Sequence, residues 1–158
     1  MKVEGDRQFD VDRKIVWDVL NDPAKMAAVM PGVQSFAIQD EKHWQATIKV
    51  PLGMGLLHMK VEFEKTEERE PEYSSLKAKG NGVGAMMNMT TSFTLEAIES
   101  GTNMHWLADV KILGPVGAMG QRILQPVVKQ QVDQVLTALD QQVHEAGSSS
   151  APEAAQAE

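Results

Sequence analysis

The chain contains no cysteine among its 158 residues. Structural disulfides, thiolate metal sites and cysteine nucleophiles are therefore excluded together. Aromatic residues are also scarce, with 4 Phe, 3 Trp and 1 Tyr, so few large rings are available to fill an interior. The N-terminal residues 1–7 lack the apolar core of a secretory signal. Nowhere do about 18 apolar residues follow one another, so we expect no membrane-spanning helix. The lack of cysteine is compatible with a cytoplasmic location.

Positive charge is in short supply as well. The 15 Lys and Arg stand against 22 Asp and Glu, which gives a formal net charge of −7. An acidic protein works against broad binding to nucleic acid phosphates, so we expect no nucleic-acid partner. The length suits one domain, which buries enough apolar surface to fold without metal or disulfide staples.

Methionine, in contrast, is abundant, because the chain holds 10 of them. The unbranched, polarisable side chain fills irregular space in a core or lines adaptable binding surfaces. Met86, Met87 and Met89 stand close together in the sequence. Two interpretations of this cluster stay open: a flexible filler of the core, or the deformable wall of a pocket.

The spacing of apolar residues predicts mostly β-structure. Strict alternation of apolar and polar residues is typical of half-buried strands. We expect such strands at residues 2–11, 33–40, 43–50, 57–64, 73–80, 87–97 and 104–112. Near-helical spacing predicts helices at residues 13–20, 24–30 and 116–145. The polar end of the chain predicts a disordered acidic tail over residues 147–158.

The order of these elements predicts an α+β fold. Consecutive strands joined by short turns favour antiparallel pairing, and a strongly twisted sheet curls. The long amphipathic helix can then cover the concave face. We therefore expect a helix-grip ligand-binding domain over residues 1–146. It consists of a curved seven-stranded antiparallel sheet wrapped on a long C-terminal helix, with two short helices after the first strand.

A curved sheet and a straight helix do not mate everywhere. The gap between them is either filled by large side chains or left as a hydrophobic cavity, and both outcomes stay open. Several inward positions are small or slender, among them Ala46, Thr91 and Ala108. For the cavity we predict ten ligand-binding residues on the inward faces of strands and helix: Trp44, Met59, Phe63, Met87, Met89, Phe93, Trp106, Met119, Ile123 and Val127.

Candidate catalytic groups are nearly absent from the inward faces of the strands, where Arg7 is the one charged residue that shares the parity of Val3 and Phe9. His58 and Glu62 alternate with Met59, so they lie on the opposite face of the sheet. The four histidines are dispersed without the spacing of metal ligands. The glycine-rich residues 80–84 break the strand pattern but lack the Lys-Ser/Thr of a nucleotide-binding loop. We therefore expect a non-enzymatic binding protein with no catalytic residue, no metal site and no covalently bound cofactor.

Three segments carry a family resemblance. They are residues 16–23, VWDVLNDP, followed by residues 30–32, MPG; residues 50–55, VPLGMG; and residues 113–122, LGPVGAMGQR. In order and spacing they resemble the family of the carbon monoxide dehydrogenase G subunit, which is part of the START-like (SRPBCC) helix-grip superfamily. The resemblance covers the chain from its start to about residue 143.

The resemblance implies a cytoplasmic accessory protein of a molybdenum hydroxylase such as carbon monoxide dehydrogenase. It also implies quinone binding or lipid binding in the helix-grip cavity, and a role in recruiting the enzyme to the membrane. A peripheral position at the inner face of the membrane, with transient contact to its surface, would follow. Residues 111–129 carry Arg122 but no acid. Such a stretch faces anionic head groups or an acidic partner, or is an ordinary solvated helix face.

Two other functions stay open at this point. The first is a protein–protein adaptor whose cavity is incidental. The second is a polyketide cyclase-like enzyme of the same superfamily. Such an enzyme requires an inward acid, base or tyrosine, and the sole tyrosine of the chain is Tyr73.

Overall fold

The computed structural model describes the backbone of residues 1–52 and 55–156, and the side chains within these ranges up to Ser148. Residues 53 and 54, part of a family-like segment, and the last two residues of the predicted tail lie outside the described residues. The strands are β1 (Lys2–Phe9), β2 (Val33–Ile38), β3 (His43–Pro51), β4 (Leu56–Arg69), β5 (Tyr73–Gly82), β6 (Ala85–Ile98) and β7 (Gly101–Leu113). The helices are α1 (Arg13–Leu20), α2 (Pro23–Val29), the 3-10 helix η1 (Gly117–Met119) and α3 (Gln121–Gln156).

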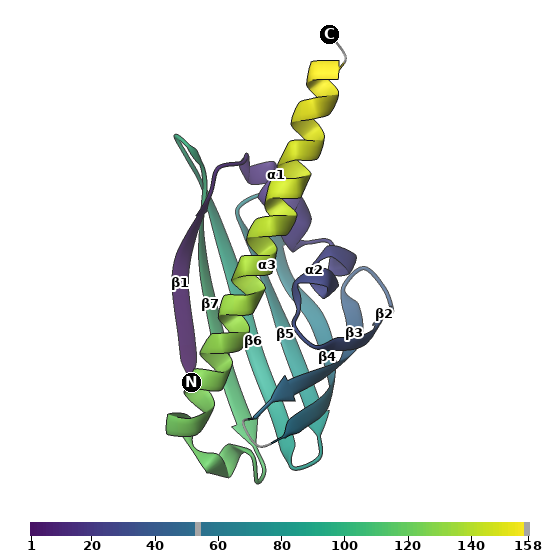
Figure 1. Ribbon diagram of the computed structural model, residues 1–158, viewed down its shortest axis with the longest axis vertical. Helices are drawn as coiled ribbons and strands as arrows, with labels where there is room; N and C mark the ends of the chain where they lie inside the picture. Colours follow the sequence, from purple (N-terminus) through teal and green to yellow (C-terminus); the bar gives the residue numbers. More distant parts are fainter. Residues whose placement is uncertain (53–54, 157–158) are drawn as a thin grey trace.

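The seven strands of the described residues form one antiparallel sheet. Their order is β1-β7-β6-β5-β4-β3-β2, so every pair of neighbours except β1 and β7 is also consecutive in the sequence. The long helix α3 crosses one face of this curved sheet, with α1 and α2 beside it (Figure 1). The predicted helix-grip architecture is confirmed, including the two short helices after the first strand.

Two aspartates precede the short helices. Asp22 Oδ1 accepts hydrogen bonds from the backbone N–H of Ala24 at 3.0 Å and of Lys25 at 3.4 Å, and Pro23 occupies the first helical position. These contacts satisfy N–H groups that have no partner within the helix. Asp12 stands in extended conformation before α1, where its side chain makes no capping hydrogen bond to the described chain.

The glycine-rich residues 80–84 belong to a regular hairpin. β5 continues to Gly82, and the turn into β6 takes only two residues. A Cβ on Gly80 would lie 2.7 Å from Met59 Cε, and one on Gly82 would lie 2.5 Å from the carbonyl oxygen of His58. The predicted break in the strand is therefore wrong for residues 80–82, because glycine makes room there for neighbouring atoms and does not end the strand.

The long helix begins and ends later than the sequence predicted. It starts at Gln121, after η1, and not at residue 116. At its other end α3 continues to Gln156, past the boundary that was predicted at Gly147. The helix passes close to the start of α1 at this point, since a Cβ on Gly147 would lie 2.7 Å from Val11 Cγ1. A glycine that usually weakens a helix here permits its close packing.

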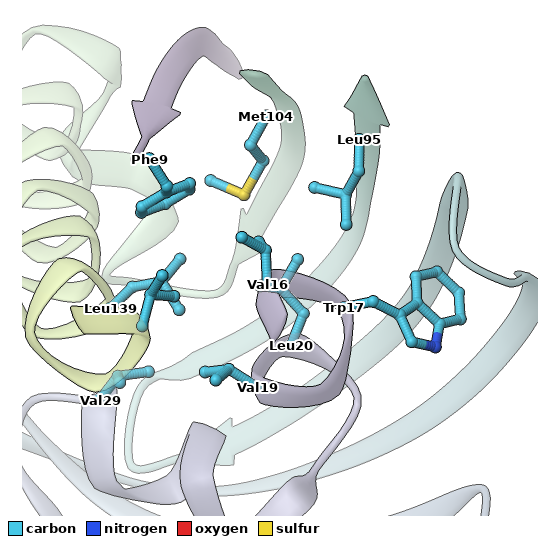
Figure 2. Packing of buried hydrophobic residues seen from close by; sticks show 10 residues of the cluster. Phe9, Val16, Trp17, Val19, Leu20, Val29, Leu95, Met104 and Leu139 are labelled. Carbon is cyan, nitrogen blue, oxygen red and sulfur yellow. The ribbon is translucent and has the colours of Figure 1, made fainter. Parts of the chain in front are cut away.

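One end of the domain is a tightly packed hydrophobic core (Figure 2). All three α-helices and strands β1, β6 and β7 contribute to it, and Met104 and Val16 at its centre are 0 % exposed. We call this region the packed end, and its buried residues are Phe9, Val16, Trp17, Val19, Leu20, Val29, Leu95, Met104, Leu139 and Val143. This core anchors α3 to the sheet.

Candidate ligand-binding cavity

An apolar cavity of about 300 Å³ lies between the other end of the sheet and the first half of α3. Strands β3 to β7 form one wall. The residues of this wall are Ile48, Val50, Leu57, Met59, Val61, Phe63, Leu76, Ala85, Met87, Met89, Thr91, Phe93, Trp106, Ala108, Val110 and Ile112. Met26, Met30, Pro31, Leu52 and Val116 contribute from the connections and from α2.

Methionine side chains shape the sheet wall. Met59 and Met87 both reach over Gly80, because a Cβ there would lie 2.7 Å from Met59 Cε and 3.4 Å from Met87 Cε. Of the three clustered methionines, Met87 and Met89 line the cavity and Met86 is exposed. Flexible thioether chains can rearrange around a guest molecule. This wall is therefore deformable.

Short side chains form the helix wall. Positions three and four apart share one face of an α-helix. The residues of α3 that line the cavity follow this spacing: Leu124, Val127, Val128, Gln131, Val132, Val135, Leu136 and Leu139. Four of them are valines, whose side chains do not extend far enough to fill the concave sheet. The mismatch between a curved sheet and a straight helix thus leaves open volume.

Three polar side chains occur in the described lining. Thr91 Oγ1 donates a hydrogen bond to the carbonyl oxygen of Leu107 at 2.8 Å. The indole Nε1 of Trp106 is buried and has no partner in the described part of the chain. Gln131 is half-buried on the facing helix, and its side chain makes no hydrogen bond to the described residues. Two of the three polar groups are therefore unpaired.

Seven of the ten predicted ligand-binding residues line the cavity. They are Met59, Phe63, Met87, Met89, Phe93, Trp106 and Val127. Trp44 is buried outside the lining, where its ring stacks on that of Phe63 with 5.8 Å between centroids. Met119 and Ile123 are exposed, Ile123 to 50 %. Their predicted place in the cavity wall is wrong.

The register of α3 explains the error at Ile123. Repeated steps of four residues through Ile123 and Val127 drift around the helix, because one turn takes 3.6 residues. The structure selects a face that runs through Leu124 and Val128. Gln131 also belongs to this face, but as a polar residue it does not contribute to the apolar pattern of the helix. A single polar residue four positions from Val127 and Val135 was the signal available in the sequence.

The described lining contains no ionisable side chain. Tyr73, the residue that a cyclase-like enzyme would need, lies at the start of β5 outside the cavity. There its ring packs under the guanidinium group of Arg69 at 4.6 Å. Within the described residues, no three His, Cys, Asp or Glu side chains gather closely enough to hold a metal ion.

A second hollow of about 400 Å³ lies at the packed end, between β1 and α3. The two carboxylates in its lining, Asp10 and Asp140, each have a neighbouring nitrogen partner. Arg7 forms a hydrogen-bonded ion pair with Asp140, and His144 Nδ1 lies 3.5 Å from Asp10 Oδ1. The hydrogen bond to Asp140 raises the pKa of Arg7 above its ordinary value. These contacts hold α3 to the end of β1, so we assign them a structural role.

The fold and the apolar cavity define a START-like helix-grip protein. A conserved protein of Geobacillus kaustophilus is similar with a TM-score of 0.85 at 20% identity, covering 92% of this chain and 97% of that one. A START superfamily protein of Mycobacterium smegmatis follows with 0.70 at 10% identity, covering 91% and 97%. A protein of Thermus thermophilus gives 0.68 at 13% identity, covering 92% and 99%. At such identities the likeness shows the fold alone.

The sequence model that describes the G subunit of carbon monoxide dehydrogenase (CoxG) matches residues 5–144. The chain therefore belongs to the CoxG family, which confirms the resemblance of the three segments. A search of curated proteins finds no match. None of the helices in the described residues is both long and apolar enough to cross a membrane.

Proposed function

We propose that this protein binds an uncharged, mostly apolar molecule in the cavity under α3 and carries it without transforming it. The lining carries the proposal, because apolar side chains surround three polar ones and no described lining residue is ionisable. Small-molecule sites are typically concave, mainly apolar and furnished with a few placed polar groups, in volumes of roughly 300–1,000 Å³. The cavity, at about 300 Å³, lies at the lower end of that range.

The unpaired polar groups favour a ligand that carries an oxygen acceptor. An unsatisfied buried N–H costs about 1–3 kcal/mol, and Trp106 Nε1 is such a group. The amide of Gln131, on the opposite wall, can donate as well as accept. A carbonyl oxygen can accept from the Gln131 amide, whereas Trp106 Nε1 lies against β1, 3.3 Å from where a Cβ on Gly5 would stand. A carboxylate or phosphate would lack a counter-ion in this lining, and burying an unpaired charge is strongly unfavourable.

A quinone has these properties, because its ring bears two carbonyl oxygens and its tail is apolar. We propose a quinone, or a lipid-like molecule with a similar polar head, as the ligand. The description of the family names carbon monoxide dehydrogenase, which supports a role as an accessory protein of such a molybdenum hydroxylase. In this role the protein would recruit the enzyme to the membrane, where quinones are dissolved.

A binding role is better supported than catalysis. Acid–base catalysis needs a titratable side chain within hydrogen-bond reach of the reacting group. The described lining supplies none, and Tyr73 packs against Arg69 outside the cavity. The three polar side chains of the lining are an amide, a hydroxyl and an indole. Such groups can bind and orient a ligand but do not act as acids or bases near neutral pH.

The proposal is tested by a matched pair of tryptophan substitutions on α3. A short-tailed quinone is titrated by calorimetry into protein purified without detergent. Val128→Trp fills the cavity and should weaken binding at least about tenfold. Ile123→Trp adds the same side chain to the exposed face of the same helix and should bind like the wild type.

Equal affinities for the two variants would mean that the quinone binds outside the cavity. A wild-type protein that binds neither the quinone nor another apolar probe would contradict the carrier function. In that case, capture of the dehydrogenase subunits by the ligand-free protein is the result expected of an adaptor.

A further inference from the structure

Exposed apolar side chains gather at one end of the domain. The start of β4, the β5–β6 hairpin, the end of β7 and the start of α3 lie together at the lower end of Figure 1. Met86 lies opposite Leu113 in the sheet, and the N–H of Val116 donates to the carbonyl oxygen of Gly84 at 2.9 Å. We call this surface the apolar tip, and its exposed residues are Leu56, Val83, Met86, Leu113, Met119 and Ile123.

The apolar tip holds nearly all of the large apolar side chains that are exposed. Within the described residues, Ile38 on β2 is the only other one. Val83 is the most prominent, since it stands on the crown of the β5–β6 hairpin and is 95 % exposed. Turn positions of this kind are usually occupied by Gly, Asn, Asp or Ser. Folding alone gives no reason for a valine there.

Basic residues surround the apolar tip. The three segments that build it, residues 49–61, 80–89 and 110–129, contain no Asp or Glu, although Asp109 borders the last of them and the whole chain has a net charge of −7. Their basic residues are Lys49, Lys60, Lys111, Arg122 and Lys129. None of these forms an ion pair with the described residues. The acidic protein therefore presents an apolar surface with unpaired positive charge at one end.

The apolar tip also adjoins the cavity. Four of its residues are chain neighbours of residues in the cavity lining: Leu56 of Leu57, Met86 of Met87, Leu113 of Ile112, and Ile123 of Leu124. On the strands, successive side chains point to opposite faces. The same end of the sheet is thus hollow on its inner side and apolar on its exposed side.

We propose that the apolar tip docks on a bilayer that contains anionic lipid. Val83 and its apolar neighbours insert below the head groups, while the five cations contact the negatively charged surface. This inference rests on the proposed function, because a bilayer is the place where an apolar ligand enters or leaves the cavity. Apolar insertion and electrostatic attraction add to each other in peripheral membrane contacts.

A fluid bilayer suits this surface better than a folded partner. Apart from the cross-strand neighbours Met86 and Leu113, the exposed residues sit on separate turns and element ends. A stable protein interface needs about 800 Å² of matching surface on each partner. Lipid tails adapt to separate side chains without such matching, and unpaired cations around apolar residues are the pattern expected of a membrane surface site.

Co-flotation with lipid vesicles tests this inference. The full chain is mixed with vesicles of phosphatidylcholine, with or without phosphatidylglycerol. The wild type should float with the anionic vesicles, and less protein should float as salt concentration rises. Val83→Asp should lower the bound fraction about tenfold, and the neutral Val83→Asn should lower it less. Because the side chain of Val83 is almost fully exposed, neither change should affect folding.

The matched control is Ile38→Asp. Ile38 is 54 % exposed. It pairs with Trp44 on β3, and Trp44 pairs with Phe63 on β4. Phe63 lies seven residues along β4 from Leu56 of the apolar tip. At about 3.3 Å per residue this places it roughly 23 Å from the apolar tip. Ile38→Asp introduces the same charge and should float like the wild type.

Three results would overturn the docking site. Flotation that is unchanged by Val83→Asp, or absent in the wild type, shows that the apolar tip does not bind lipid. A wild-type dimer that Val83→Asp converts to a monomer, without any vesicle binding, assigns the apolar tip to a second copy of the chain. Titration with quinone distinguishes a failure of the docking site from a failure of the proposed function. Val83→Asp should retain the wild-type affinity for quinone, and Val128→Trp should float normally while losing the quinone.

Discussion

The two ends of the sheet are covered by the same helix but are filled in different ways. At the packed end, α1 and α2 add Trp17, Leu20 and Val29 to the space between α3 and the sheet. At the cavity end, mainly the valine-rich face of α3 lies over the sheet. Leu139 stands at the boundary, since it belongs to the packed core and also to the cavity lining.

This difference separates stability from binding along one helix. Close packing at one end supplies dispersion contacts that the side chains around a cavity lack. A ligand in the cavity would restore such contacts and stabilise the folded state in proportion to its occupancy. The packed end can therefore hold the fold together while the other end stays adaptable.

Alanine substitutions of two methionines should give the largest difference between the ends. Met104→Ala removes a side chain that is 0 % exposed and should destabilise the protein by about 3 kcal/mol. Met89→Ala, on the cavity wall, should cost about 1 kcal/mol or less, because its side chain already borders open volume. Urea unfolding of the ligand-free variants measures both losses. Equal losses would mean that the cavity end is packed as tightly as the other.

Enlarging a side chain should also destabilise the packed end more than the cavity end. Val16→Phe overfills the packed end and should cost about 1–3 kcal/mol. Val128→Phe enters the cavity and should change the free energy of unfolding by less than about 1 kcal/mol. Thermal and urea unfolding provide the comparison. A large loss at Val128 would contradict the open volume.

Replacing the polar residue of the helix wall should alter binding more than folding. Gln131→Leu removes an amide that can bind a ligand oxygen and should lower quinone affinity about tenfold. Its affinity for a hydrocarbon of similar shape should not fall. Gln134→Leu, on the exposed side of α3, is the control and should leave both affinities unchanged. Calorimetric titration with the two ligands separates these outcomes.

The smallest effect is expected from the ion pair between β1 and α3. Arg7 and Asp140 are each about a third exposed, so solvent screening limits the loss in Arg7→Met to about 0.5 kcal/mol. Because the hydrogen bond raises the pKa of Arg7, the contribution is complete below the ordinary pKa of arginine and is lost only as the pH rises through the raised value. A double-mutant cycle with Asp140→Asn measures the coupling at neutral pH. Quinone affinity should stay unchanged in both variants.

Much of this architecture could be predicted from local patterns. The alternation of Leu57, Met59, Val61 and Phe63 with polar residues marks β4, and these four residues do line the cavity. Antiparallel order followed from the short connections between strands. Such signals are local, and the tertiary structure agrees with them.

Other features depend on contacts that the sequence does not show locally. Several registers of α3 present apolar residues over residues 119–128, and packing against the sheet decides that Leu124 faces inward and Ile123 does not. In the same way, the sequence alone suggests that Gly80 breaks the strand. The structure shows that Gly80 makes room for the side chain of Met59 on the neighbouring strand. The openness of the cavity depends on how far the whole sheet curves away from the helix.

Native mass spectrometry of the full chain, purified without detergent, tests the central claim most directly. The wild type and Ile123→Trp should carry the additional mass of an apolar molecule that organic solvent releases. Val128→Trp should appear at the mass of the bare chain. A wild-type protein that appears bare, and that gains no mass after incubation with a quinone, would contradict the account of the cavity as a ligand-binding site.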